Sequence, residues 1–231
     1  LSHRNAIEGI FSAASLMFMR TNSNRMGSLD INAGDDITSS YKRIDNKTDI
    51  FNGNVSISKK IFSWNTSFSL EGNYELLRKD LIRQDRTVGM DMNNYGCRFG
   101  INSNPLRNYL IMGLDVNYSH SIQKIESFGV DNHTGQTSLN FSLATRPIKS
   151  LEISANGYFN RSNVGNDISK NSLFLDASIR YTPKSFDIEL SARNLTNTRR
   201  YSYSYIKDSD IYRYSFRLRP LELLLSIKYS F

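Results

Sequence analysis

The sequence predicts an all-β protein, an antiparallel up-and-down transmembrane β-barrel of about ten long strands. Three observations predict it. Apolar and polar residues alternate with period two through most of the chain after residue 50. Turn signals recur at intervals of roughly 40 residues, and each interval holds two strands. Hydrophobic residues make up only 39% of the chain, which suits strands that need an apolar residue only at alternate positions.

The alternation is cleanest in the segment 64–75. Trp64, Phe68, Leu70 and Tyr74 fall on one face there, and Asn, Ser and Glu residues fall on the other. The same alternation and the turns between segments predict ten strands, at 7–22, 42–60, 63–79, 87–103, 107–125, 134–146, 149–163, 170–182, 185–206 and 210–231. The stretch 23–41 is interpreted as a long loop with room for a hairpin of its own.

The connections predict two different ends. Tight turns are predicted at 59–63, 103–107, 145–150 and 182–186, where three of the four prolines lie. Longer, charged loops are predicted at 76–89, 127–136, 162–171 and 205–210. Short turns at one end and long loops at the other are typical of outer-membrane barrels.

Aromatic residues set a length scale. Trp64 and Tyr74 share the apolar face, and they are separated by roughly 23 Å along the membrane normal if the strand tilts by about 45°. An outward apolar band of about 25 Å edged by aromatic residues is expected of a membrane barrel. A soluble sandwich with the apolar face inward shows the same alternation and remains an alternative. Polar faces rich in Asn, Ser and Glu but poor in Lys favour a wet lumen.

Composition limits the function classes. The net charge of +7 is compatible with nucleic acid, an anionic membrane or acidic ligands, but Asp80, Asp85, Asp208 and Asp210 interrupt any basic track, so no nucleic-acid partner is predicted. The three His residues and the single Cys97 show no metal-ligand spacing, and one Cys cannot form an internal disulfide. No phosphate loop or catalytic constellation is present. We therefore predict no enzyme activity, no metal and no cofactor.

Charged residues on the polar face are predicted to face the lumen. They are Glu71, Arg98, Asp115, Glu152, Asp176, Arg180, Glu189 and Arg193. Structural ion pairs between strands are the favoured interpretation, and a substrate site is the alternative.

A run of tyrosines flanks the sequence IKDSD at a predicted extracellular tip. Tyr203, Tyr205, Tyr212 and Tyr214 suit contact with a sugar or peptide ligand, and they equally suit a hairpin whose rings pack against each other. Arg217 and Arg219 share the parity of Leu221, so they are predicted to face outward toward lipopolysaccharide phosphates.

The end of the chain resembles a known family. The stretch FDIELSARNLTNTRRYSYSY at 186–205 and the terminal RPLELLLSIKYSF resemble the C-terminal end of TonB-dependent receptors of the outer membrane, of the barrel type common in Bacteroidota. The family's Asn-Leu-x-Asn stretch, with basic and aromatic residues after it, is matched by Asn194, Leu195, Asn197 and Tyr201. Tyr229 and Phe231 match the aromatic end of the last strand.

The resemblance implies a location, a function and a set of partners. Such receptors import a nutrient, such as an oligosaccharide, a peptide or a metal chelate, across the bacterial outer membrane through a barrel of about 22 strands with a plug. Tyr229 and Phe231 would then be the signal read by the barrel assembly machinery. Residues 1–231 are expected to be the C-terminal portion of such a barrel, with the plug and earlier strands absent. Further expected partners are outer-membrane lipid, lipopolysaccharide, TonB and a surface lipoprotein.

Two other functions stay open at this point. Ten strands are an even number and could close by themselves, as a small porin or an adhesin. The chain could also be a structural barrel within an outer-membrane complex.

Overall fold

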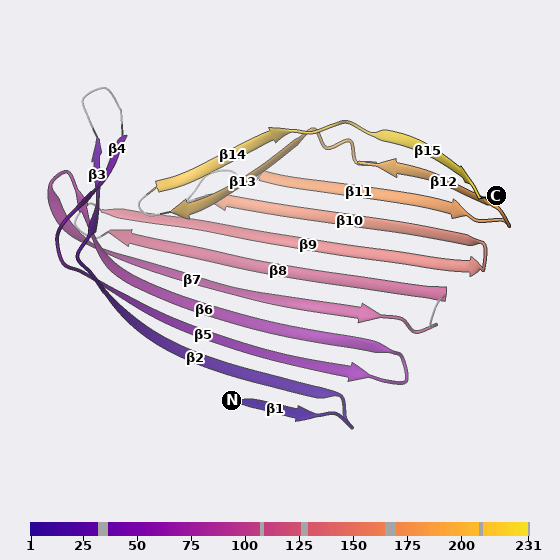
Figure 1. Ribbon diagram of the computed structural model, residues 1–231, viewed down its shortest axis with the longest axis horizontal. Coiled ribbons are helices and arrows are strands. Elements are labelled where there is room, and N and C mark those ends of the chain that lie inside the picture. The colour runs from indigo at the N-terminus through magenta and orange to yellow at the C-terminus, as the bar shows by residue number, and fades with distance from the viewer. Residues whose placement is uncertain (32–36, 107–108, 126–128, 165–169, 208–209, 231) are drawn as a thin grey trace.

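The computed structural model describes residues 1–231 except 32–36, 107–108, 126–128, 165–169, 208–209 and 231 (Figure 1). The fold is all-β, as predicted. The strands are β1 (Ser2–Asn5), β2 (Ile10–Ser23), β3 (Met26–Ile31), β4 (Ile37–Lys42), β5 (Asn46–Ile61), β6 (Thr66–Arg83), β7 (Arg86–Ser103), β8 (Leu110–Ile125), β9 (Val130–Ile148), β10 (Leu151–Val164), β11 (Lys170–Tyr181), β12 (Phe186–Arg193), β13 (Arg200–Lys207), β14 (Asp210–Arg217) and β15 (Glu222–Tyr229).

The strands form one large sheet and one separate hairpin. The large sheet has 13 strands and the order β1-β2-β5-β6-β7-β8-β9-β10-β11-β12-β15, from which the β3–β4 hairpin branches at β6. Neighbours along this path are antiparallel, whereas β3 pairs with β6 in parallel over two residues. Strands β13 and β14 pair only with each other. The predicted antiparallel up-and-down topology is therefore confirmed.

The described strands form an open, curved sheet. β1 lies at one edge and β15 at the other, and no hydrogen-bonded ladder joins these two strands within the described residues (Figure 1). Closure into a barrel stays a prediction.

The register aligns the apolar residues of successive strands. Ile57 is opposite Leu70, Leu70 is opposite Phe99, Phe99 is opposite Val116, and Val116 is opposite Leu139. Because side chains alternate between the two faces of a strand, this row fixes the face of every other residue. We call the face that carries this row the apolar face, and the opposite face the polar face.

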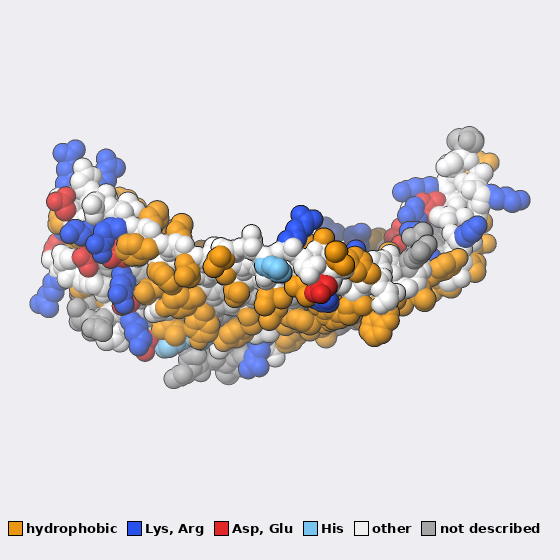
Figure 2. Space-filling view, turned by 90° about the horizontal axis from the view of Figure 1, so that it is seen from below, with side chains coloured by type: hydrophobic (Ala, Val, Ile, Leu, Met, Phe, Trp, Pro, Cys, Tyr) orange, Lys and Arg blue, Asp and Glu red, His pale blue; other side chains and the backbone are white. Residues whose placement is uncertain are grey.

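No second layer formed by the described residues covers the apolar face. Figure 2 shows the sheet as one curved layer, with hydrophobic side chains along the middle of its convex side and charged ones gathered toward both ends. Leu16, Leu225 and Ile227 are 78%, 65% and 60% exposed. The accessible surface is 15859 Å², against about 10,700 Å² for a compact monomer of this mass. Among the described residues, no helix is long and apolar enough to cross a membrane.

A small buried core lies at the end of the sheet away from the tight turns. Leu81, Val88, Met90 and Ile125 pack together there, each at most 5% exposed. They belong to the polar face by register, so that face is polar over its middle and apolar at this end. The sequence analysis placed Leu81 in a loop and Met90 and Ile125 in strands, and it did not predict that these residues form a cluster.

The predicted long loops are largely strand, which corrects the expected asymmetry. β6 and β7 run on to Arg83 and Arg86, and only Gln84 and Asp85 connect them, with φ of 49° and 59°. Two residues with positive φ suit the type I′ turn of a tight hairpin. β9 likewise begins at Val130, inside the predicted loop at 127–136, whereas β8 ends at Ile125 as predicted. The connections between β6 and β7 and between β8 and β9 are thus shorter than predicted.

Other boundaries also differ from the prediction. The predicted strand 185–206 is split into β12 and β13, and the predicted strand 210–231 is split into β14 and β15. The short β1 was not predicted, and the stretch 23–41 contains most of the β3–β4 hairpin. The first break lies at the Asn-Leu-x-Asn stretch, described below, and the second spans 218–221, which includes Pro220.

Candidate functional site

The predicted lumen residues share the polar face, and three of them form one ion-pair group. Arg98 Nε donates to Asp115 Oδ2 at 2.6 Å, and Arg98 Nη1 lies 4.0 Å from Glu71 Oε2. β6, β7 and β8 supply one residue each, and Glu71 is directly opposite Arg98 in the register. Asn117 is opposite Arg98 on the other side. The Arg98 guanidinium thus lies between a carboxylate on β6 and a carboxylate on β8.

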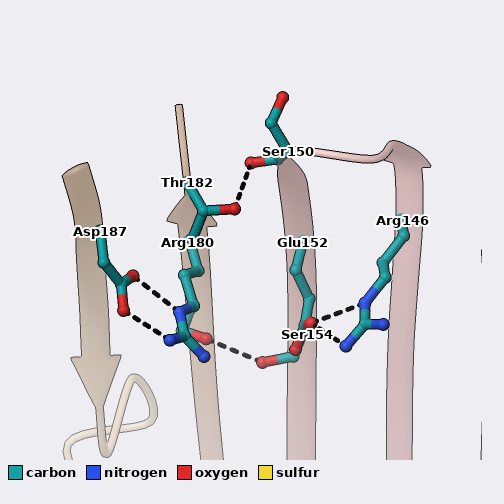
Figure 3. A network of polar contacts seen from close by, with 8 residues as sticks. Arg146, Ser150, Glu152, Ser154, Arg180, Thr182 and Asp187 are labelled. Atoms are coloured by element: carbon teal, nitrogen blue, oxygen red, sulfur yellow. Dashed lines mark hydrogen bonds and ion pairs between the residues drawn. The ribbon is translucent and has the colours of Figure 1, made fainter. Parts of the chain in front are cut away.

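A second group lies near the tight turns (Figure 3). Arg180 holds Asp187 through hydrogen bonds of 2.8 and 2.5 Å, and Arg146 holds Glu152 through contacts of 2.8 and 2.7 Å. The hydroxyls of Ser154 and Ser178 lie 2.8 Å apart between the two pairs. Arg146 and Asp187 were not in the predicted set of lumen residues, because ion-pair partners on neighbouring strands cannot be chosen without the register.

Of the remaining predicted lumen residues, Asp176 is held by a hydrogen bond to the backbone, and the register shows which residues lie opposite Glu189 and Arg193. Asp176 Oδ1 accepts the backbone N–H of Asn194 at 2.7 Å, so this carboxylate holds a chain corner. Glu189 is opposite Arg180 and Ser226, and Arg193 is opposite Glu222. Most of the predicted lumen charges therefore have a partner within the protein, which agrees with the structural interpretation.

Two hollows on this face meet at Arg98. One of 400 Å³ is lined by Asp115, Asn140, Asn156 and Asp176 among others, and one of 690 Å³ is lined by Glu71 and asparagines of β5, β6 and β8. Carboxamides and ion-paired charges thus line the middle of the polar face.

The Asn-Leu-x-Asn stretch forms a hydrogen-bonded corner between β12 and β13. Asn194 and Asn197 have φ of 54° and 51°, a conformation that Asn tolerates better than most residues. Asn194 Nδ2 donates to the carbonyls of Thr198 and Arg219, at 2.9 and 2.8 Å, and its Oδ1 accepts the Thr198 N–H at 2.9 Å. One side chain therefore joins the exit of β12 to the segment between β14 and β15.

The corner is also fastened to β11. The Leu195 N–H donates to the Leu175 carbonyl at 2.7 Å, and the Thr196 hydroxyl donates to the Leu173 carbonyl at 2.5 Å. Beyond it, the β13–β14 hairpin leaves the line of β12 and β15 (Figure 1). The corner at 194–197 thus turns this hairpin out of the sheet.

The tyrosines of the hairpin form one ladder of rings. Tyr203 and Tyr214 are directly opposite each other with ring centroids 5.2 Å apart, and Tyr205 and Tyr212 form an equal pair at 5.2 Å. Hydrogen bonding with Tyr214, together with lost hydration, raises the pKa of Tyr205 to about 12. The predicted ligand contacts are therefore stacked on one another, as the hairpin interpretation expects.

The ladder continues onto the large sheet through Tyr201. Its ring lies 6.4 Å from Tyr158 and 6.2 Å from Phe174, which project from the polar face of β10 and β11. The hydroxyls of Tyr158 and Tyr201 are 3.4 Å apart. The hairpin is thus attached to the polar face.

A row of alternating charge crosses the apolar face, and sequence reasoning missed it. Six directly opposed residues on β2, β5, β6, β7, β8 and β9 alternate in sign: Arg20, Asp49, Arg78, Asp91, Lys124 and Asp131. Arg20 contacts Asp49 at 2.6 Å, and Arg78 contacts Asp91 at 3.6 Å. Only the register reveals the row, because its members are far apart in sequence.

The predicted assembly signal lies partly outside the described residues. Tyr229 packs against Phe186 with ring centroids 5.0 Å apart, near the tight-turn end of the sheet. Phe231 falls outside the described residues. Of the two arginines predicted to face lipopolysaccharide, Arg219 lies 3.5 Å from Glu222.

No family model, no curated protein and no solved structure matches this chain. No group of three or more potential metal ligands occurs among the described residues. What the fold and the site define is a class: a single-layer antiparallel sheet with one uncovered apolar face, one ion-paired polar face and a tyrosine hairpin attached to the latter.

Proposed function

We propose that this chain forms part of the wall of a bacterial outer-membrane β-barrel, with its apolar face toward lipid and its polar face toward a water-filled lumen. The uncovered apolar face carries the proposal. Large exposed hydrophobic side chains on this scale are unfavourable in water, since monomeric soluble proteins rarely expose continuous apolar patches of more than a few hundred Å². Lipid chains can cover such an apolar face without cost. The hydrogen bonds between neighbouring strands pair the backbone N–H and C=O groups, as a membrane requires.

The charges on the apolar face support a membrane band of the right height. On β5, Asp49 and Lys59 project from this face, and Phe51, Val55 and Ile57 lie between them. Ten residues of strand span about 33 Å, or roughly 23 Å along the membrane normal at a tilt of 45°. The charge row through Asp49 would then lie at the outer headgroup level, and the tight turns at the periplasmic side.

The barrel would be completed by further strands at its two edges. An open edge in a membrane leaves backbone N–H and C=O groups without partners, and each such group costs several kcal/mol in lipid. We propose that strands of the same gene or of another chain pair with β1 and β15. The resemblance of Asn194, Leu195, Asn197 and Tyr201 to the TonB-dependent receptors makes a nutrient importer of that family the best assignment, with a conduit role rather than an enzymatic one.

The proposed partners follow from that assignment. They are outer-membrane lipid, lipopolysaccharide, a plug in the lumen, the barrel assembly machinery during biogenesis, and TonB with a surface lipoprotein during transport. A self-contained small porin or adhesin is the alternative, and it requires β1 and β15 to pair with each other.

Spin labels at two adjacent positions test the orientation. In a Cys97→Ser background, labels at Leu139 and Asn140 are compared in outer-membrane vesicles. We expect the label at Leu139 to collide with oxygen dissolved in lipid, and the label at Asn140 to collide with a water-soluble nickel complex. A soluble sandwich would shield Leu139 from both, and that result would overturn the proposal.

Disulfide cross-linking tests how the sheet closes. Cysteine pairs scanned between β1 and β15 should not cross-link within one chain if other strands occupy the edges. Efficient cross-linking between these two strands would instead establish the small porin.

A further inference from the structure

A groove lies where the tyrosine hairpin approaches the polar face, apart from the charged hollows described above. Its volume is 290 Å³, close to the lower limit of small-ligand sites. Asn94, Ser121, Thr134 and Gln136 supply polar groups from β7, β8 and β9, and Ser204 and Tyr205 of β13 line the side of the hairpin.

The floor of the groove is polar and held in place. Asn94 Nδ2 donates to Glu75 Oε1 at 2.9 Å, and Asn94 Oδ1 is hydrogen-bonded to the Ser121 hydroxyl. Gln136 Nε2 donates to Asn160 Oδ1 at 3.0 Å, and Asn160 is fully buried. Each carboxamide has two donor hydrogens and one acceptor oxygen, so one or two bonds to neighbours fix its position and leave hydrogen-bonding capacity for a ligand.

The wall is a rigid aromatic surface. Tyr205 stacks on Tyr212 and Tyr214, with centroid distances of 5.2 and 5.9 Å and interplanar angles of 13° and 7°. Tyr205 is nevertheless 39% exposed. Because the ladder already fixes this ring, a ligand that packs against it loses little further conformational entropy in the protein.

The described lining residues of the groove include one histidine, His120, and otherwise only uncharged side chains. None of its described lining residues is Asp, Glu, Lys or Arg, whereas the two hollows that meet at Arg98 are lined by both acids and arginine. An anionic chelate or a peptide terminus would lose hydration here without gaining a counter-charge, which is unfavourable. A neutral ligand that carries many hydroxyls on an apolar ring matches both the floor and the wall.

We propose that this groove binds a neutral oligosaccharide through the amide and hydroxyl groups of its floor and the Tyr205 ring. The inference rests on the proposed function, because it names the substrate class of the same conduit. It also gives the hairpin a role: the Asn194 corner places Tyr205 across from Gln136.

The experiment measures binding by the purified full chain in detergent micelles. The probes are an array of neutral glycans, acidic glycans of the same lengths and hexaglycine, and each hit is followed by calorimetric titration. We expect binding of neutral glycans. Tyr205→Ala and Gln136→Ala should each weaken it about tenfold or more, equivalent to about 1.4 kcal/mol. Tyr205→Phe, which keeps the ring and the ladder, should weaken it less.

Tyr181→Ala is the matched control, because Tyr181 is a similarly exposed tyrosine on the apolar face at the other end of the sheet. It should bind as the wild type does. Binding of acidic glycans or hexaglycine only, no binding at all, or equal affinity in wild type and the Tyr205 and Gln136 variants would overturn the inference.

The two proposals fail in different ways. Neutral-glycan binding by a protein whose spin labels place it outside the membrane would overturn the barrel and leave the site. A lipid-facing Leu139 in a protein without neutral-glycan binding would overturn only the site.

Discussion

Arg180 binds Asp187 with two hydrogen bonds, of 2.8 and 2.5 Å, although the residue directly opposite Arg180 in the register is Glu189. The guanidinium thus reaches diagonally across the β11–β12 pair toward the tight turn, and both oxygens of Asp187 accept from it. Paired donors of this kind fix geometry as well as charge. The pair therefore defines how β12 enters the sheet after the turn at 182–185.

The first prediction concerns this pair. Asp187→Asn should lower the temperature at which the folded protein loses its heat-modifiable mobility in gels, whereas Glu189→Gln should change it less. The effect should be small beside that of a substitution on the apolar face, because both side chains are partly exposed to water. A double-mutant cycle with Arg180→Ala should show strong coupling to Asp187 and weak coupling to Glu189. The reverse order of coupling would show that Arg180 pairs with Glu189 in the membrane.

The second prediction compares the two faces at one level of β8. Val116 lies in the apolar row, and Asn117 is opposite Arg98 on the polar face. Val116→Arg should impair assembly at a cost of about 2–4 kcal/mol if the residue lies near the bilayer midplane. Asn117→Arg should cost less if the polar face lines a water-filled lumen, because water would solvate the new charge. Folded and unfolded fractions in vesicles measure both, and equal costs would contradict the assignment of faces.

The sequence predicts the face of a strand residue because the alternation of apolar and polar residues is a local property of the chain. The row from Ile57 through Leu70 to Phe99 is the set that alternation alone selects. The ion pairs on the polar face were anticipated as a class for the same reason. Their partners were not, since Arg146 with Glu152 and Arg180 with Asp187 depend on register and on side-chain reach.

Other features needed information that alternation does not contain. The alternating charges from Arg20 to Asp131 share a row only once several strands are paired. Asn194 and Asn197 break a strand through their positive φ, and in sequence they look like polar residues of a continuous strand. The cluster around Met90 makes the polar face apolar at that end, and this depends on which side chains of neighbouring strands meet there.

The third prediction concerns a glycine on the apolar face. A Cβ on Gly157 would collide with the ring of Phe141, which lies over it from the neighbouring strand β9. Gly157→Ala should therefore destabilise the fold by about 1–3 kcal/mol, because the ring must leave its position. Phe141→Leu in the same chain should recover part of the loss. At Gly89 the nearest atom to an added Cβ is 3.7 Å away, so Gly89→Ala is the matched control and should be nearly neutral.

The fourth prediction concerns acid sensitivity at the β6–β7 turn. The hydrogen bond from Lys42 lowers the pKa of Asp85, and this pair ties the β3–β4 hairpin to the turn. A depressed carboxyl pKa contributes stability above the unfolded value of about 3.9, and the contribution is lost as pH falls through the folded value. Amide hydrogen exchange in β3 and β4 should thus accelerate below about pH 4 more than expected from intrinsic rates.

Asp85→Asn provides the control for this effect. Asn also tolerates the positive φ of 59° at this position, so the turn should persist without the ion pair. The variant should show faster exchange in β3 and β4 at neutral pH and no further acceleration in acid. An unchanged acid response would assign the effect to another carboxyl group.

The fifth prediction concerns the corner that directs the tyrosine hairpin. Asn194→Ala removes three side-chain hydrogen bonds that join β12, Thr198 and Arg219, and it places an unsuited residue at a φ of 54°. Tyr201 contacts Tyr158 and Phe174 only while the hairpin lies against the polar face. The near-ultraviolet circular dichroism of the variant should therefore be weaker than that of the wild type. Trypsin should also cut faster at Arg199, Arg200 and Arg213.

Two further variants at this position separate the backbone from the side chain. Asn194→Gly relieves the positive φ but still loses the hydrogen bonds, whereas Asn194→Asp keeps the acceptor for the Thr198 N–H and loses both donors. If the side chain holds the corner, the glycine variant should be cut nearly as fast as the alanine variant, and the aspartate variant should be intermediate. If the glycine variant resists trypsin as the wild type does, backbone conformation alone sets the corner, and the hydrogen bonds from Asn194 to Thr198 and Arg219 do not position the hairpin.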